Sequence, residues 1–180
     1  MAAVTTLPAA FVANTVLTAA EMNNLRGAFR VLQVVSTNLP TTFSTSALSY
    51  TDITELSVSI TPSSNTSKVM VFVNFQASVS TDTVLMFQLV RGSTAIDIGD
   101  AASLRTRASF SMIESDTAKQ GGSFSLNFLD SPATTSATTY KMQMFCAAVS
   151  TGYINRTAAD QDLALRPRTA ANITVMEISA

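Results

Sequence analysis

Apolar and polar side chains alternate along most of the chain after residue 31. Between Thr54 and Thr61, for example, Leu56, Val58 and Ile60 alternate with Ser and Thr. Such alternation is typical of a strand that buries one face and leaves the other in water. The pattern predicts strands at Val31–Thr37, Thr54–Thr61, Lys68–Val79, Val84–Arg91, Thr94–Ile98, Ala108–Glu114, Gly122–Leu129, Thr138–Val149 and Ile173–Ser179.

The strand predicted at Lys68–Val79 has an unusual second face. Every residue on its first face is apolar, whereas the second face changes from Met70 and Phe72 to Asn74 and Gln76. A fully buried strand is apolar on both faces, and a half-exposed one on only one. We therefore expect this strand to be covered on both faces at one end only.

Clusters of turn-forming residues separate the predicted strands, at Pro62–Asn65, Arg91–Ser93 and Asp130–Pro132. Only two gaps between strands are long, Gly99–Arg107 and Asn155–Ala171. Many short strands with turns between them, and no repeat of fixed period, argue against a solenoid or propeller. The predicted fold is mainly β, an antiparallel β-sandwich or jelly roll.

The first 30 residues follow a different pattern. Residues 1–16 have no sustained period and contain Pro8, so we predict an extended or irregular arm. Thr18 followed by Glu21 forms a capping box, and the apolar residues then recur every three or four positions, at Met22, Leu25, Phe29 and Leu32. This predicts a short helix that packs either on its own domain or between subunits. We therefore divide the chain into an N-terminal anchoring arm with a short helix, 1–30, and a β knob, 31–180. The residues expected to mediate attachment or oligomerisation are Val12, Leu17, Met22, Leu25, Phe29 and Leu32.

The composition indicates a surface that is covered by other subunits or is neutral. Hydrophobic residues make up 47% and charged residues 13% of the 180 residues, and the mean hydropathy is +0.28. No continuous apolar span is long enough for a membrane helix, and no basic segment precedes an apolar run as in a secretion signal. The net charge of −1 provides no cationic field for nucleic acid. We expect neither membrane nor nucleic acid as a partner.

The residue types needed for common catalytic chemistry are missing or scattered. The chain has no His, which removes His-based triads, Cys–His dyads and the commonest metal ligand. The single cysteine, Cys146, shares an apolar strand face and is expected to be a buried, inert thiol. Two acidic pairs, Asp97 with Asp100 and Asp160 with Asp162, could bind Ca²⁺, but solvated turns are the favoured interpretation. We expect no enzyme activity, no metal and no cofactor.

The two long gaps contain most of the candidate ligand-binding side chains. These are Arg105, Arg107, Tyr153, Arg156, Arg166 and Arg168. The favoured interpretation is loop charge, or salt bridges to the acidic pairs of the same gaps. The alternative is a subunit interface or a groove for an anionic glycan, because Arg binds carboxylates with two hydrogen bonds.

Several stretches of the chain resemble virion proteins of tailed bacteriophages, of the tail-fibre and particle-appendage type. They are Phe43–Val79 (FSTSALSYTDITELSVSITPSSNTSKVMVFVNFQASV), Leu89–Ser109 (LVRGSTAIDIGDAASLRTRAS), Phe124–Phe145 (FSLNFLDSPATTSATTYKMQMF), Gly152–Thr157 (GYINRT) and Ile173–Ile178 (ITVMEI). At the N-terminus, Phe11–Phe29 (FVANTVLTAAEMNNLRGAF) resembles the helix openings of phage structural proteins.

The resemblance implies a trimeric β-sandwich knob, of jelly-roll or tumour-necrosis-factor-like type, on a short N-terminal anchor. It implies a location in the virion, with other copies of the chain and other capsid or tail proteins as partners. The chain has no long repetitive shaft, so a capsid decoration or head fibre fits as well as a tail fibre. A carbohydrate-binding module that recognises a host surface glycan is the alternative function.

Overall fold

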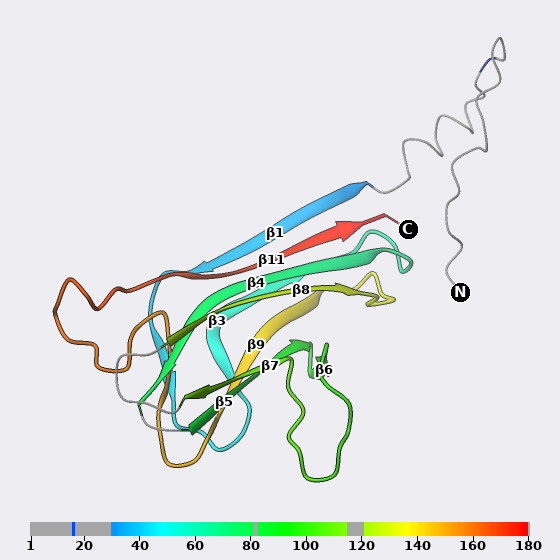
Figure 1. Ribbon diagram of the computed structural model, residues 1–180. Coiled ribbons are helices and arrows are strands. Elements are labelled where there is room, and N and C mark those ends of the chain that lie inside the picture. Colours follow the sequence, from blue (N-terminus) through cyan, green and yellow to red (C-terminus); the bar gives the residue numbers. More distant parts are fainter. Residues whose placement is uncertain (1–15, 17–29, 81–82, 115–120, 180) are drawn as a thin grey trace.

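The computed structural model describes residue 16 and the ranges 30–80, 83–114 and 121–179, which contain strands and loops but no helix. The strands are β1 (Val31–Leu39), β2 (Phe43–Thr45), β3 (Thr51–Ile60), β4 (Lys68–Val79), β5 (Thr83–Arg91), β6 (Thr94–Ile96), β7 (Phe110–Glu114), β8 (Gly121–Asp130), β9 (Thr138–Ala147), β10 (Gly152–Ile154) and β11 (Ala171–Ile178). They form two antiparallel sheets that pack against each other (Figure 1). The predicted fold class, an antiparallel β-sandwich, is confirmed.

The order of the strands is that of a jelly roll. Sheet A runs β1–β11–β4–β8, and the short strand β10 pairs with the last part of β4 and with β2 on its other side. Sheet B runs β3–β9–β5, and β6 and β7 both pair with the far edge of β5. The chain crosses between the sheets at every step from β2 to β5 and again at every step from β7 to β10. Two sheets linked by such Greek-key crossings define the jelly roll.

The core lies between the sheets and is built from the alternating apolar positions. All six inward residues of β4, Val69 to Val79, are buried, as are Tyr140, Met142, Met144 and Cys146 on β9. An aromatic cluster joins the two sheets. Within it, Phe110 of β7 and Phe124 of β8 stack with ring centroids 5.2 Å apart and planes 8° apart.

Two buried carboxylates fix strands and loops to each other. Asp130 on β8 accepts hydrogen bonds from Arg91 of β5 at 2.8 and 2.9 Å and from the Tyr140 hydroxyl at 2.6 Å. Since β8 belongs to sheet A and the two donors to sheet B, these bonds link the layers. Burial and the Asp130 hydrogen bond raise the pKa of Tyr140, so its hydroxyl stays protonated and donates.

The second buried carboxylate, Glu177 on β11, fixes β1 and the loop after β3. It accepts hydrogen bonds from Gln33 Nε2 at 2.6 Å and from the backbone N–H and hydroxyl of Ser63, both at 2.7 Å. Burial alone would raise the pKa of Glu177, but these bonds outweigh it and lower the pKa to about 2. The carboxylate is therefore ionised and fully hydrogen-bonded inside the fold.

The predicted strands match the observed ones with small shifts at their ends. Lys68–Val79 is confirmed at both ends as β4, and the two long gaps contain no regular strand apart from the ends of their neighbours. The three-residue strands β2 and β10 were not predicted from alternation.

One assignment in the N-terminal region was wrong. Leu32, predicted as the last apolar position of a helix, lies in β1, where antiparallel pairing with β11 begins. The strand prediction for Val31–Thr37 holds instead, because the partner strand satisfies the backbone of this segment. The rest of the predicted arm and helix, with Val12, Leu17, Met22, Leu25 and Phe29, lies outside the described residues.

Candidate interaction surfaces

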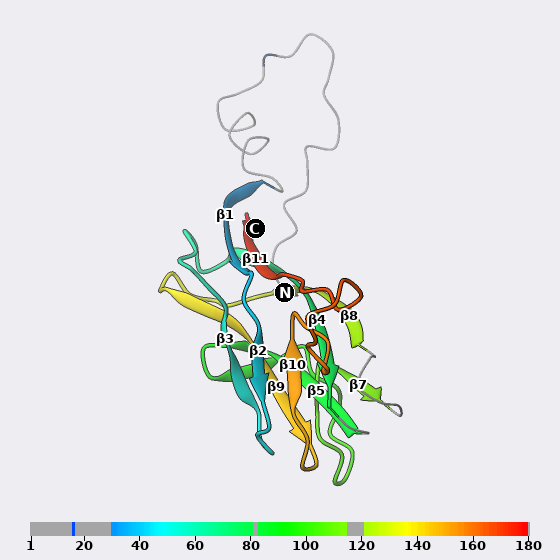
Figure 2. The same ribbon diagram turned by 90° about the vertical axis from the view of Figure 1, so that its left-hand side faces the viewer.

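The described part of the chain begins and ends at the same end of the sandwich. The backbone N–H of Arg30 donates to the Ser179 hydroxyl at 2.9 Å, and the Ser179 N–H donates to the Arg30 carbonyl at 2.9 Å. Figure 2 shows β1 and β11 side by side where the chain enters the knob. Gln33 also donates to the Thr61 carbonyl there, at 2.7 Å. We call this the entry end.

The loop between β10 and β11 lies at the opposite end and contains three of the predicted site residues, and a fourth, Tyr153, lies just before it in β10. The Arg156 guanidinium lies 4.2 Å above the Tyr153 ring and 3.3 Å from Asp160. Arg168 binds the same carboxylate with two hydrogen bonds, at 2.6 and 3.1 Å. Arg166 donates to the Gln161 side chain at 3.4 Å. The predicted salt bridges to Asp160 are confirmed, so Arg156 and Arg168 hold the shape of the loop.

The arginines of the other long gap do not join this group. Arg107 donates to the Gly99 carbonyl at 2.6 Å within its own loop, and Arg105 is exposed. In Figure 1 the two loops lie on different parts of the molecule, the first drawn in green and the second in orange. The two sets of arginines therefore do not form one anionic-ligand site.

The outer face of sheet A has a row of apolar side chains at its entry end. Val34, Met176, Met70 and Leu129 are successive cross-strand partners on β1, β11, β4 and β8. Val34 is 54% and Leu129 50% exposed, and no described strand or loop lies over them. We call these four residues the apolar row. From the apolar Met70 and Phe72 we expected this end of β4 to be covered on both faces. Among the described residues, no strand or loop covers its outer face.

The outer face of sheet A becomes polar with distance from the entry end, and it stays uncharged. The next row is Ser36, Thr174, Phe72 and Asn127, and the one after it is Asn38, Asn172, Asn74 and Ser125. The hydroxyls of Ser36 and Thr174 share a hydrogen bond of 2.8 Å. Lys68, at the entry-end corner of β4, is the one charged residue on these strands that points outward, and it donates to Ser131 at 2.7 Å.

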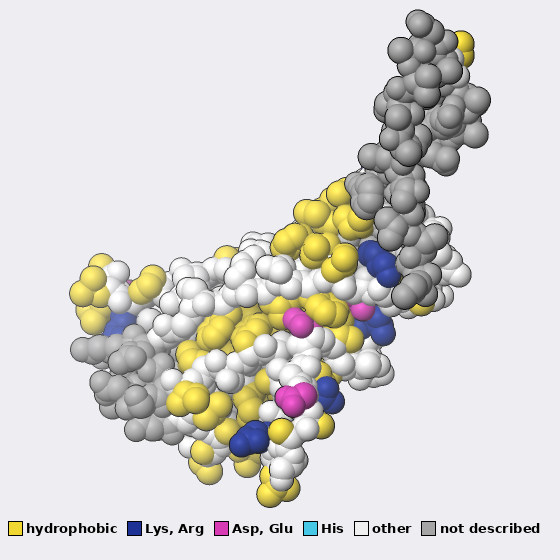
Figure 3. Space-filling model, turned by 45° about the vertical axis from the view of Figure 1, so that its right-hand side comes forward, with side chains coloured by type: hydrophobic (Ala, Val, Ile, Leu, Met, Phe, Trp, Pro, Cys, Tyr) yellow, Lys and Arg dark blue, Asp and Glu magenta, His cyan; other side chains and the backbone are white. Residues whose placement is uncertain are grey.

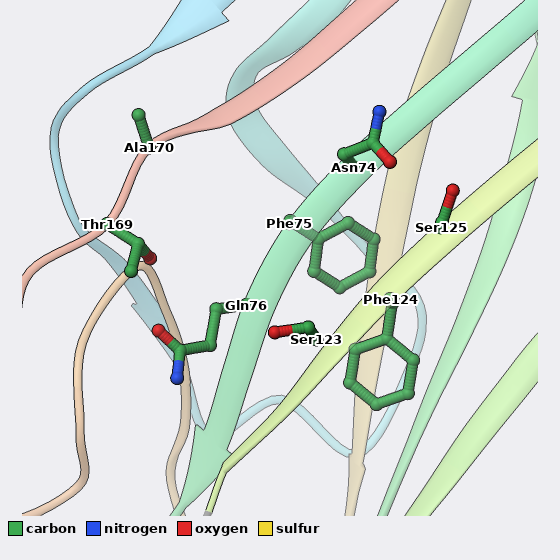
Figure 4. A pocket seen from close by; sticks show the side chains of 8 residues that line it. All are labelled: Asn74, Phe75, Gln76, Ser123, Phe124, Ser125, Thr169 and Ala170. Carbon is green, nitrogen blue, oxygen red and sulfur yellow. The ribbon is translucent and has the colours of Figure 1, made fainter.

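A shallow groove of 280 Å³ lies at the polar end of this face. It is lined by residues of β4, β8 and the segment before β11: Asn74, Phe75, Gln76, Ser123, Phe124, Ser125, Thr169 and Ala170 (Figure 4). Gln76 Oε1 and Thr169 Oγ1 are buried and have no hydrogen-bond partner among the described residues. The groove offers amide and hydroxyl groups and no charge, which suits a neutral, hydroxyl-bearing ligand. Sequence reasoning missed it, because only the register of β4 with β8 brings these polar positions together.

A second apolar region follows the edge of the sandwich where β8 lies opposite β7. Ile96, Phe110, Phe124 and Phe128 are only partly buried there and pack against the core. Figure 3 shows hydrophobic side chains gathered in a band across this side of the molecule, with few charged groups among them. β8 pairs with β4 alone, so its other edge is unpaired within the described strands.

The described residues do not assemble a group with obvious reactive chemistry. No three Cys, Asp or Glu side chains of the described ranges come together in a way that could hold a metal ion. Burial raises the pKa of the Cys146 thiol, which fits the predicted inert cysteine. No helix within the described ranges is long and apolar enough to span a membrane. No family model matches the sequence, and no curated protein matches it.

Proposed function

We propose that this protein is a non-enzymatic structural subunit of a bacteriophage particle, a homotrimer that attaches through its N-terminal segment and displays the β knob. The proposal rests on the positions of two features at opposite ends of the knob, the entry of the chain and an arginine-containing loop. The chain enters at one end, where Arg30 and Ser179 are hydrogen-bonded, and the loop between β10 and β11, with Arg156 and Arg168, lies at the other. A subunit held by its N-terminus would present that loop outward.

The charge distribution supports a structural role. Three of the acidic side chains are held by basic or hydroxyl partners that serve the fold: Asp130 by Arg91 and Tyr140, Asp160 by Arg156 and Arg168, and Asp52 by Lys141 at 2.7 Å. Groups fixed in this way stabilise loops and layers. Together with the lack of His and the resemblance to phage appendage proteins, they favour a particle component over a catalyst.

Removal of residues 1–29 tests the attachment. The truncated chain keeps Arg30 and the whole jelly roll, so we expect it to stay folded, with the melting temperature of the full chain and a circular dichroism spectrum typical of β structure. We expect the full chain, but not the truncated one, to co-sediment with particles of the phage that encodes it. Unfolding of the truncated chain, or binding equal to that of the full chain, would contradict attachment through this segment.

The polar groove favours a second candidate function, recognition of a neutral carbohydrate on the host surface. Asn74, Ser123 and Ser125 offer exposed amide and hydroxyl groups there, which can hydrogen-bond to sugar hydroxyls. A glycan array with the full chain and with a Ser123→Trp, Ser125→Trp variant that fills the groove tests this candidate. Binding lost in the variant supports it, and binding by neither protein, or equally by both, contradicts it.

A further inference from the structure

We propose that the outer face of sheet A, centred on the apolar row, is the surface through which copies of this chain associate. This inference rests on the proposed homotrimer and assigns its contact surface. The first argument is exposure. Val34 and Leu129 are each about half exposed at the two ends of the row, and Met70 and Met176 between them are only partly buried. Contiguous exposed apolar surface of this kind marks interaction sites on soluble proteins.

The second argument is the size of the surface. The four strands, at about 4.8 Å spacing, and the stretch from Lys68 to Gln76, at about 3.3 Å per residue, give a face of roughly 500 Å² in projection. A stable interface needs about 800 Å² from each partner. The partly buried Phe124 and Phe128 continue the apolar surface around the edge strand β8 and add to that area.

The third argument identifies the occupant. Identical copies bring identical charges close to their symmetry axis, where like charges repel. The three cross-strand rows of this face contain no Asp, Glu, Lys or Arg, and the one outward charge, Lys68, lies at the entry-end corner and donates to Ser131, so a copy can approach the rows without such repulsion. The Ser, Thr and Asn side chains beside the apolar row both donate and accept hydrogen bonds, and can pair with the same residue types of another copy.

The other sheet offers a contrast. Its outer face carries the ion pair of Asp52 with Lys141 and a hydrogen bond between Gln88 and Gln143 at 2.6 Å. Burying this ion pair against the same pair of another copy would remove both charges from water, and the desolvation cost opposes such a contact. Of the two sheet faces, that of sheet A is the better suited to self-contact.

Charge introduced into the apolar row tests the assignment in the full chain. Met70 and Met176 are cross-strand partners, so the double variant Met70→Lys, Met176→Lys puts two adjacent ammonium groups at the centre of the face. The matched control is Ser59→Lys, Thr139→Lys, a cross-strand pair whose hydroxyls lie 2.7 Å apart on the outer face of sheet B. Sedimentation equilibrium gives the mass of each protein, and circular dichroism reports its folding.

We expect the unaltered chain and the control to have the mass of an oligomer, and the Met70, Met176 variant to have the 19.0 kDa mass of one chain. Should that variant fail to fold, Val34→Lys, at an exposed position of the edge strand, replaces it, and the same loss of mass is expected. An oligomer that persists in a folded variant overturns the assignment of this face and leaves the proposed homotrimer standing. An unaltered chain that is already monomeric overturns both.

Discussion

The buried carboxylate of Glu177 gives the sharpest prediction about stability. Its pKa of about 2 lies well below the ordinary value of 4.5, because Gln33 and Ser63 donate three hydrogen bonds to it. A depressed pKa in the folded state means that the ionised form stabilises the fold. The difference in pKa corresponds to about 3 kcal/mol, at roughly 1.4 kcal/mol per pH unit.

The sign of the pH dependence follows from the direction of this shift. The contribution of Glu177 is fully present above pH 4.5, where the side chain is ionised in both the folded and the unfolded chain. As the pH falls from 4.5 to 2, the unfolded chain takes up a proton before the folded one does, and the contribution is lost. Glu177→Gln removes the titrating group and should be about 3 kcal/mol less stable at neutral pH.

Urea unfolding of the two proteins over this pH range measures the effect. The chain has no Trp, so far-UV circular dichroism is the appropriate probe. We expect the gap between the unaltered chain and Glu177→Gln to be largest at neutral pH and to close as the pH approaches 2. Asp52→Asn serves as the control, because this carboxylate is 52% exposed and its ion pair should contribute less than about 1 kcal/mol. Equal stability of the two proteins at neutral pH, or a gap independent of pH, refutes the reasoning.

Three further predictions concern the interior. Tyr140→Phe leaves Asp130 without one of its donors and should lower the free energy of unfolding by about 1–3 kcal/mol in urea titrations, whereas Tyr153→Phe should have little effect. Phe75→Ala opens a cavity at the centre of the aromatic cluster and should cost about 3–5 kcal/mol, with Phe145→Ala on the outer face of sheet B costing clearly less. Cys146, fully buried, should not react with a disulfide reagent in the native protein and should react at once in urea; rapid native labelling would show that β9 opens.

Local sequence predicted the strands well where the pattern was long and both ends were marked. β4 has twelve alternating or apolar positions that follow the turn cluster Pro62–Asn65 and end with Val79, the last apolar residue of the inward face, and its bounds followed directly. Three residues are too few to show alternation, so β2 and β10 were missed. Leu32 fits both a helical spacing from Phe29 and the alternation of a strand. Only the partner strand β11, more than a hundred residues away, decides between them.

The candidate surfaces depend on register, which the sequence does not reveal. Met70 stood out as an apolar residue on the more polar face of its strand, and we expected that end of the face to be covered, but no described strand or loop covers it. Its alignment with Met176 and Leu129 comes from pairing across the sheet. Likewise, Arg168 meets Asp160 inside an irregular loop, where no periodic pattern links the two positions. The sequence indicated salt bridges to the acidic pairs. It did not indicate that Arg156 and Arg168 bind the same carboxylate, that of Asp160.

The pairing of β1 with β11 determines how the knob would respond to mechanical load. β1 begins directly after Arg30 and is paired with β11 from Val31 opposite Ile178 to Leu39 opposite Ala171. Antiparallel hydrogen bonds lie perpendicular to the strands, so a tension applied at Arg30 along β1 loads the ladder in shear, with all bonds strained together. A tension directed across the sheet would break them one after another. The knob would therefore resist unravelling far better when it is pulled along β1 than when it is pulled across the sheet.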